Sequence, residues 1–236
     1  MRVLVIGDSL VMPRLEYNYD ETWLSHLVNH YPSIEFIDKS RRSSSARRLV
    51  NDGAGAGDSR RGADLLEYYN PDLVITQIGI TDCSPRLLKR DKLYTKVINS
   101  LPRNISNLIY NYIRKTKGRT MKNNDLSPEE FRNCWENYIK RANIIGTKIL
   151  CLLIAPAVDR FLMANPLVEE SIKIYNRVLE DLAQKYPNFV CVTPFTKLEM
   201  EEFALIDGYH IGTRGHKALY KKLVSYLDEF VEEGQK

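Results

Sequence analysis

The sequence predicts an α/β protein built on a parallel, doubly wound β-sheet with right-handed crossovers. Five short apolar runs, nearly continuous in Val, Ile and Leu, are spread over the 236 residues, and segments long enough for helices separate them. Such runs are typical of strands that are covered on both faces. Strands that alternate with helices favour a parallel sheet. The length suits one domain with a substantial core, so we expect a single domain over residues 1–236.

The strands and helices can be placed along the chain from these patterns. The predicted strands are residues 2–7, 34–39, 72–79, 148–156 and 189–195. The predicted helices are residues 21–31, 62–69, 127–145, 166–186 and 214–232. The third helix has a helix-start pattern, because Ser127 is followed by Pro128 and then by Glu130.

A basic segment interrupts this alternation after the third strand. Residues 86–122 contain eleven lysines and arginines and one acid, Asp91, a net charge of +10 in a chain whose total is +4. Apolar residues within the segment have helical spacing, which predicts a helical insertion at about residues 86–125. The simplest interpretation of its charge is a solvated face. A sharper hypothesis is contact with an anionic glycan or an anionic membrane surface; we expect no nucleic-acid partner, because aromatic residues are sparse there outside Tyr110 and Tyr112.

No pattern for a metal, a cofactor or a membrane span is present. The four cysteines are far apart in sequence and form no CxxC or Cys/His pair, so we expect neither a metal nor an organic cofactor. The glycine-rich stretch 53–57 lacks the spacing of a phosphate-binding loop. No run reaches the roughly 18 apolar residues of a membrane span. We expect a cytoplasmic protein that the basic segment can bring to the membrane periphery.

Polar residues with catalytic potential follow the first and last strands. Ser9 comes directly after the first strand, and ligands of open α/β sheets bind beyond the carboxyl ends of the strands. A serine hydroxyl needs a base to become a good nucleophile. Of the four histidines, His26 and His30 fall on the first predicted helix and His216 in the last one. His210 lies in a loop after the last strand, three residues beyond Asp207, whose carboxylate could fix the tautomer of the imidazole.

The sequence resembles the SGNH/GDSL hydrolase family through three blocks in order. Residues 7–10 read GDSL, residues 79–82 read GITD in place of a G-x-N-D block, and residues 207–210 read DGYH, a D-x-x-H block. The resemblance implies a flavodoxin-like three-layer α/β/α sandwich with a five-stranded parallel sheet. It also implies that Ser9 is the nucleophile, His210 the base and Asp207 its orienting carboxylate, in ester hydrolysis or acyl transfer without a metal or cofactor.

Two blocks depart from the family pattern. Thr81 stands where the family places an asparagine of the oxyanion hole, so the resemblance implies a hole formed by the Ser9 and Gly79 N–H groups with the Thr81 hydroxyl. The glycine of the second block is replaced near Ser43. The third block continues as GITDCSPR, which is similar to SGNH-like proteins associated with bacterial surface-polysaccharide gene clusters. Ser43, Asp82 and Arg86 are therefore expected to contact the substrate, with Arg86 able to hold a carboxylate or phosphate.

Three functions remain open at this point. The first is a serine esterase that removes a small acyl group, such as acetyl, from a carbohydrate. The second is an acyltransferase in which a sugar hydroxyl replaces water, because the first half-reaction is the same. The third is a catalytically weak glycan-binding protein, for which the replacements at Thr81 and Ser43 argue. The sequence indicates no oligomeric state.

Overall fold

A five-stranded parallel sheet forms the centre of the protein. The structure is a computed structural model that describes residues 1–51 and 62–233, so the glycine-rich stretch 53–57 lies outside the described residues. The strands are β1 (Arg2–Gly7), β2 (Glu35–Asp38), β3 (Leu73–Gln77), β4 (Lys148–Leu152) and β5 (Phe189–Val192). Their order is β2-β1-β3-β4-β5 and all neighbours are parallel. This is the flavodoxin-like order, and the predicted doubly wound sheet is confirmed.

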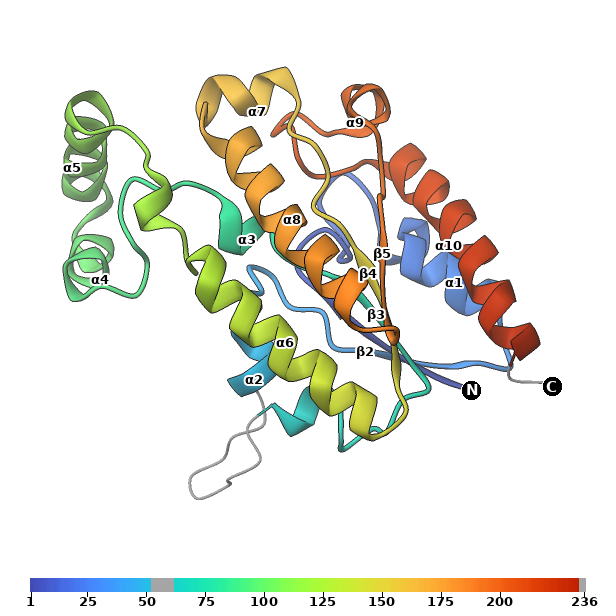
Figure 1. Ribbon diagram of the computed structural model, residues 1–236. Helices are drawn as coiled ribbons and strands as arrows, with labels where there is room; N and C mark the ends of the chain where they lie inside the picture. The colour runs from blue at the N-terminus through green and yellow to red at the C-terminus, as the bar shows by residue number, and fades with distance from the viewer. Residues whose placement is uncertain (52–61, 234–236) are drawn as a thin grey trace.

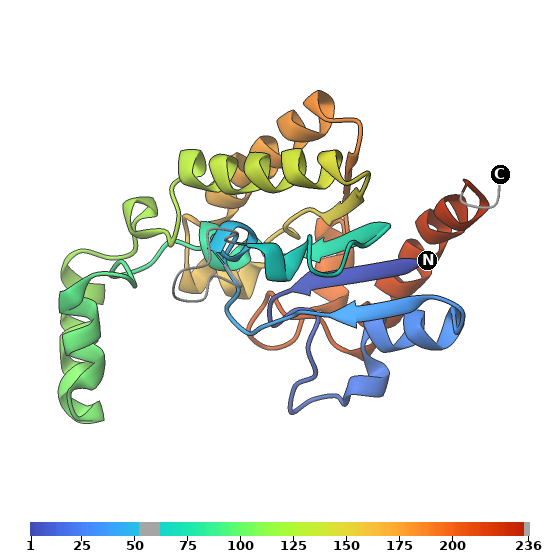
Figure 2. The same ribbon diagram turned by 90° about the horizontal axis from the view of Figure 1, so that it is seen from below.

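Helices cover both faces of this sheet (Figures 1 and 2). The helices that pack on the two faces are α1 (Trp23–His30), α6 (Pro128–Ile144), α8 (Val168–Lys185) and α10 (Thr213–Glu233). Alternate residues of β1 face the two layers: Leu4 and Ile6 pack in the core under α6 and α8, whereas Val3 and Val5 pack in the core under α1 and α10. The near-continuous apolar runs of the sequence therefore reflect burial on both faces.

The remaining described helices lie between these elements along the chain. They are α2 (Arg48–Asn51), α3 (Ile80–Cys83), α4 (Leu93–Ser100), α5 (Arg103–Thr116), α7 (Asp159–Ala164) and α9 (Lys197–Phe203). Three 3₁₀ turns, η1 (Tyr19–Glu21), η2 (Ala63–Leu65) and η3 (Met121–Asn123), complete the described elements. The Ser127 hydroxyl accepts from the Glu130 N–H and caps α6, as the sequence predicts.

Several of the predicted elements are shorter than the sequence indicates: the strands predicted over 72–79 and 189–195 end at Gln77 and Val192. The helix predicted over 62–69 is wrong, because only the single turn η2 forms; at Leu66 φ is −157° and ψ is −82°, outside the helical region. The strand predicted over 148–156 ends at Leu152. Beyond it, the Asn176 side chain bonds both the N–H and the C=O of Ile154 at 2.9 and 2.8 Å and so replaces a neighbouring strand.

The basic segment folds into a pair of helices beside the sheet. α4 and α5 pack on each other and extend away from the three layers in both views (Figures 1 and 2). Several large apolar side chains of the pair are exposed: Leu93, Val97, Ile105, Leu108 and Tyr112. Within residues 1–51 and 62–233, no helix is long and apolar enough to cross a membrane. Contact of this segment with a glycan or membrane, and the cytoplasmic location, stay predictions.

Candidate active site

The end of β1 is shaped to hold Ser9 at the carboxyl edge of the sheet. The Asp8 N–H still bonds the Gln77 carbonyl at 3.1 Å, which extends the ladder between β1 and β3. One Asp8 carboxylate oxygen then accepts from the Leu10 N–H at 2.8 Å and closes a tight turn over Ser9. A Cβ atom on Gly7 would collide with the Val11 side chain. The Gly-Asp-Ser sequence therefore ends the strand and presents the Ser9 side chain at the sheet edge.

The loop before α10 holds His210 in a matching position. One Asp207 carboxylate oxygen accepts from the N–H groups of His210 and Tyr209 at 3.0 and 3.2 Å, which ties the four-residue block into a turn. Gly208 has a φ of 82° and lies against Phe161, so a residue with a Cβ would be strained and crowded there. His210 is buried, with 3% of its surface exposed.

Three side chains form one chain of hydrogen bonds across this edge. The Ser9 Oγ lies 2.8 Å from His210 Nε2, and His210 Nδ1 lies 2.7 Å from Asp207 Oδ2. Burial opposes ionisation of Asp207, but hydrogen bonds from the His210 ring and N–H outweigh it and lower its pKa to about 2. The ionised carboxylate favours the tautomer with a proton on Nδ1, which leaves Nε2 to accept from the serine hydroxyl.

Arg14 is a fourth side chain at this edge, and no pattern in the sequence predicts it. One of its terminal nitrogens lies 3.4 Å from the Asp207 oxygen that faces His210, and its Nε lies 3.5 Å from Glu16. A positive charge there favours the ionised form of Asp207. Arg14 lies in the loop after β1, where its backbone forms an isolated antiparallel β-bridge with Tyr17.

The other histidines support the packing of α1 against α10. His216 is fully buried, its Nδ1 accepts from the Trp23 N–H at 3.2 Å, and burial lowers its pKa to about 3. His30 Nδ1 lies 2.5 Å from the Tyr220 hydroxyl, and the His26 ring packs on the same tyrosine. Among the four, His210 is the one that meets Ser9.

Two buried carboxyl groups lie behind the site. Burial raises the pKa of Asp8 to about 7 and that of Asp82 to about 7. Asp82 accepts from the Ser45 hydroxyl at 2.5 Å and from the Ala46 N–H at 2.9 Å, and it has no exposed surface. The predicted contact between Asp82 and the substrate is therefore wrong, because the side chain is used to anchor the loop before α2.

Donors for an oxyanion are available beside Ser9. Among the described residues, the N–H groups of Ser9 and Gly79 and the Thr81 hydroxyl have no hydrogen-bond partner. Gly79 has a φ of 134° and an added Cβ would lie 2.8 Å from Ile154, so this backbone conformation requires glycine. Ser9 and Thr81 line the same cleft, which Gly79 does not line. The oxyanion hole itself stays a prediction.

Ser43 occupies the cleft in a conformation that glycine adopts more readily. Its φ is 58°, in the left-handed region that non-glycine residues rarely enter. Here a serine adopts the left-handed conformation near the position where the sequence resemblance places a glycine. The predicted substrate contact of Ser43 stays a prediction, supported by its place in the cleft wall.

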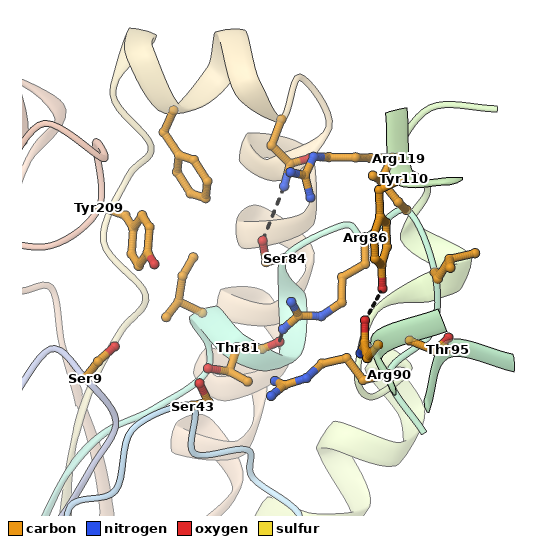
Figure 3. Close-up of a pocket in the computed structure, with 16 residues that line it drawn as sticks. Ser9, Ser43, Thr81, Ser84, Arg86, Arg90, Thr95, Tyr110, Arg119 and Tyr209 are labelled. Atoms are coloured by element: carbon orange, nitrogen blue, oxygen red, sulfur yellow. Dashed lines mark hydrogen bonds between the residues drawn. The ribbon is translucent and has the colours of Figure 1, made fainter. Parts of the chain in front are cut away.

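A cleft of about 560 Å³ extends from Ser9 to the α4–α5 pair (Figure 3). Its size is within the range of small-molecule sites. In the view, Tyr209 lies above Ser9, and the hydroxyl side chains of Thr81 and Ser43 lie to its right. Arg86, which the sequence singled out, lies farther along the cleft with Arg90 and Arg119, two residues that the sequence did not single out. No group of His, Cys, Asp and Glu in the described part of the chain could hold a metal ion.

Solved structures with this fold include an acetylxylan esterase and a G-D-S-L family protein. TesA aligns with a TM-score of 0.60 and 16% identity over 96% of this chain and 98% of its own. A catalytic mutant of Axe2, an acetylxylan esterase from Geobacillus stearothermophilus, aligns with a TM-score of 0.61 and 14% identity over 95% and 92%. A G-D-S-L family protein from Desulfitobacterium hafniense DCB-2 aligns with a TM-score of 0.56 and 15% identity over 93% and 95%.

The chain therefore has the fold of the SGNH/GDSL hydrolases, which confirms the fold that the three sequence blocks predict. No family model matches the sequence, and no curated protein matches it. The likeness is thus one of structure, and the chemistry of this chain has to be argued from its own residues.

Proposed function

We propose that the protein is a serine esterase that removes a small acyl group, most simply acetyl, from a carbohydrate. The observation that carries the proposal is the continuous hydrogen-bonded chain from Ser9 through His210 to Asp207. The acetylxylan esterase activity named for Axe2 has the same kind of substrate, and the cleft supplies hydroxyl and amide groups suited to a sugar.

The reaction follows from this arrangement. Ser9 Oγ attacks the ester carbonyl carbon while its proton passes to His210 Nε2, and Asp207 stabilises the imidazolium that forms. The N–H of Ser9 and the hydroxyl of Thr81 donate to the oxyanion of the tetrahedral intermediate. When the intermediate collapses, the C–O bond to the sugar breaks and His210 protonates the departing alcohol. Water, deprotonated by His210, then releases the acid from the acyl-Ser9 ester.

Variants at Ser9 and His210 test the proposal. The wild-type protein should hydrolyse p-nitrophenyl acetate and be labelled by a fluorophosphonate probe. Ser9→Ala should abolish labelling, and Ser9→Ala and His210→Ala should each lower kcat by about 10⁴-fold or more. Ser40→Ala is a matched control, because Ser40 lies beside Gly7 and its hydroxyl has no partner among the described residues. Labelling that persists in Ser9→Ala would remove Ser9 from the mechanism.

An acyltransferase is the second candidate function, favoured by the length of the cleft. Beyond Ser9 the cleft continues to α4 and α5, which leaves space for an acceptor alcohol as well as the donor. Adding a methyl glycoside to the esterase assay separates the two functions. Transfer gives an acetylated glycoside and less free acetate, whereas hydrolysis gives acetate alone. Failure to hydrolyse or transfer any ester would leave a glycan-binding protein.

A further inference from the structure

The cleft carries a surplus of positive charge. Three arginines and no carboxylate are among the described residues that line it. Arg86 and Arg90 follow α3, and Arg119 follows α5. In the described part of the chain, Asp125 is the one carboxylate paired with any of them, and it lies outside the lining. Three guanidinium groups against one carboxylate leave about two positive charges without a partner.

Arg86 is used to hold the cleft together. Its Nε and one terminal nitrogen bond both oxygens of Asp125 at 2.8 and 3.2 Å, and that nitrogen also bonds the Thr81 carbonyl at 3.0 Å. These bonds fix α3 to the loop that precedes α6. The anion contact predicted for Arg86 is therefore better assigned to its neighbours. Arg90 gives one terminal nitrogen to Asp125 at 2.9 Å, and 47% of its side chain is exposed.

Arg119 has no carboxylate partner among the described residues. It donates to the carbonyls of Ala164 at 3.1 Å and Pro85 at 3.3 Å, which hold the side chain in place. Its partial burial and the nearby charges of Arg114 and Arg86 lower its pKa, so the folded protein holds this charge at a cost. An anion beside it would offset that cost.

A free hydrogen-bond acceptor lies next to Arg119. Asn165 is 1% exposed, and its amide nitrogen donates to the Pro85 carbonyl at 3.1 Å, the same carbonyl that Arg119 bonds. The Asn165 side-chain oxygen has no partner in the described part of the chain, and Asn165 lines the cleft. A buried acceptor of this kind suits a substrate hydroxyl. Donors for an anion and an acceptor for a hydroxyl therefore occur side by side.

We propose that this end of the cleft is an anion subsite, in which Arg119, beside the Asn165 side chain, binds a carboxylate or phosphate group on the substrate while its ester lies at Ser9. Figure 3 shows Ser9 on one side of the cleft and the arginines on the other. The anionic group is then on a part of the substrate remote from the ester carbonyl. The inference rests on the proposed function and narrows its substrate class to acyl esters of acidic or phosphorylated sugars.

Matched esters test the subsite. Methyl glucoside, methyl glucuronoside and methyl glucoside 6-phosphate, all acetylated at the same hydroxyl, differ in one group. For the wild type, kcat/KM should be about tenfold or more higher for an anionic ester than for the neutral ester, because a charge-assisted hydrogen bond is gained. The two anionic esters separate carboxylate from phosphate. The readout is the ratio of acidic to neutral kcat/KM, so a general loss of activity cancels.

Variants test whether the arginines cause the preference for an anionic ester. Arg119→Gln should bring the ratio close to one, Arg90→Gln should lower it less because Arg86 lies between Arg90 and Arg119 (Figure 3), and the double variant should behave as Arg119→Gln. Arg103→Gln is the control, because it removes a charge from the start of α5 outside the cleft and should leave the ratio unchanged. Equal kcat/KM for all three esters in the wild type, or a preference that survives the double variant, would overturn the subsite. Ser9-dependent hydrolysis of p-nitrophenyl acetate would still support the proposed function in that case.

Discussion

Replacing Asp8 by asparagine should change how the stability of the protein depends on pH. Asp8 has no exposed surface, one of its oxygens accepts from the Leu10 N–H, and the other has no partner among the described residues. Burial raises its pKa from 3.8 to about 7. Between these values the folded protein keeps the carboxyl proton that the unfolded chain has lost. The stability that Asp8 contributes is therefore complete below about pH 4 and is lost as the pH rises to about 7.

The size of this effect follows from the shift. About three pKa units, at roughly 1.4 kcal/mol each, correspond to about 4 kcal/mol. Asparagine keeps the bond to Leu10 and cannot ionise. The free energy of unfolding of Asp8→Asn, relative to the wild type, should therefore rise by up to about 4 kcal/mol between pH 4 and pH 8. Urea unfolding followed by the fluorescence of Trp23 and Trp135, both buried, measures it at each pH.

Asp38 provides a matched control for this experiment. It is the last residue of β2, whereas Asp8 comes directly after β1; its carboxylate accepts from the Ser40 N–H at 2.8 Å, but it is exposed. The free energy of unfolding should change with pH in the same way for Asp38→Asn as for the wild type. A constant difference between Asp8→Asn and the wild type from pH 4 to pH 8 would refute the reasoning, since Asp8 would then titrate alike in the folded and unfolded states.

Three further predictions concern the cleft and the helix pair beside it. Ser43→Gly should raise the free energy of unfolding by up to about 1 kcal/mol, because glycine adopts a φ of 58° without strain. The increase should be smaller for Asn70→Gly, because asparagine tolerates a positive φ better than serine. A lower free energy of unfolding for Ser43→Gly than for the wild type, measured by urea unfolding, would contradict the prediction. Thr81→Val should lower kcat on the order of a hundredfold with little change in KM, and an unchanged kcat would exclude the hydroxyl from the oxyanion hole. The exposed apolar side chains of α4 and α5, among them Leu108, together with the basic residues around them, should bind anionic vesicles. Salt should release the protein from vesicles that are collected by sedimentation, and Leu108→Asp should reduce the fraction of protein that sediments with them. Equal binding to neutral vesicles would contradict the prediction.

The three residues of the hydrogen-bonded chain, Ser9, His210 and Asp207, could be located from sequence because local rules place them. Ser9 directly follows an apolar strand, and Asp207 and His210 lie in one short turn after the last strand. Parallel strands bring such positions to a single edge of the sheet. The strand order itself follows from the alternation of strands and helices together with the family resemblance. These features depend on neighbours in sequence or on the general geometry of the fold.

The arginines of the cleft could not be located in this way. Arg14 meets Asp207 across 193 residues, and Arg119 contacts Ala164 across 45 residues, so their positions depend on how distant loops pack. The basic segment reads as one charged stretch, although Arg90 and Arg119 line the cleft and Arg114 does not. The early end of β4 also depends on a distant part of the chain. Asn176 of α8 bonds the backbone of Ile154, where a neighbouring strand would otherwise pair.

The distance along the chain between Ser9 and His210 has a consequence for biosynthesis. The two residues are 201 positions apart, and synthesis at about 5 to 20 residues per second separates their appearance by roughly 10 to 40 s. During that interval the nascent polypeptide exposes a serine without its base. Under the proposed mechanism, ester turnover begins only after the loop that precedes α10 has docked, so the onset of activity in a translation reaction would time the completion of folding.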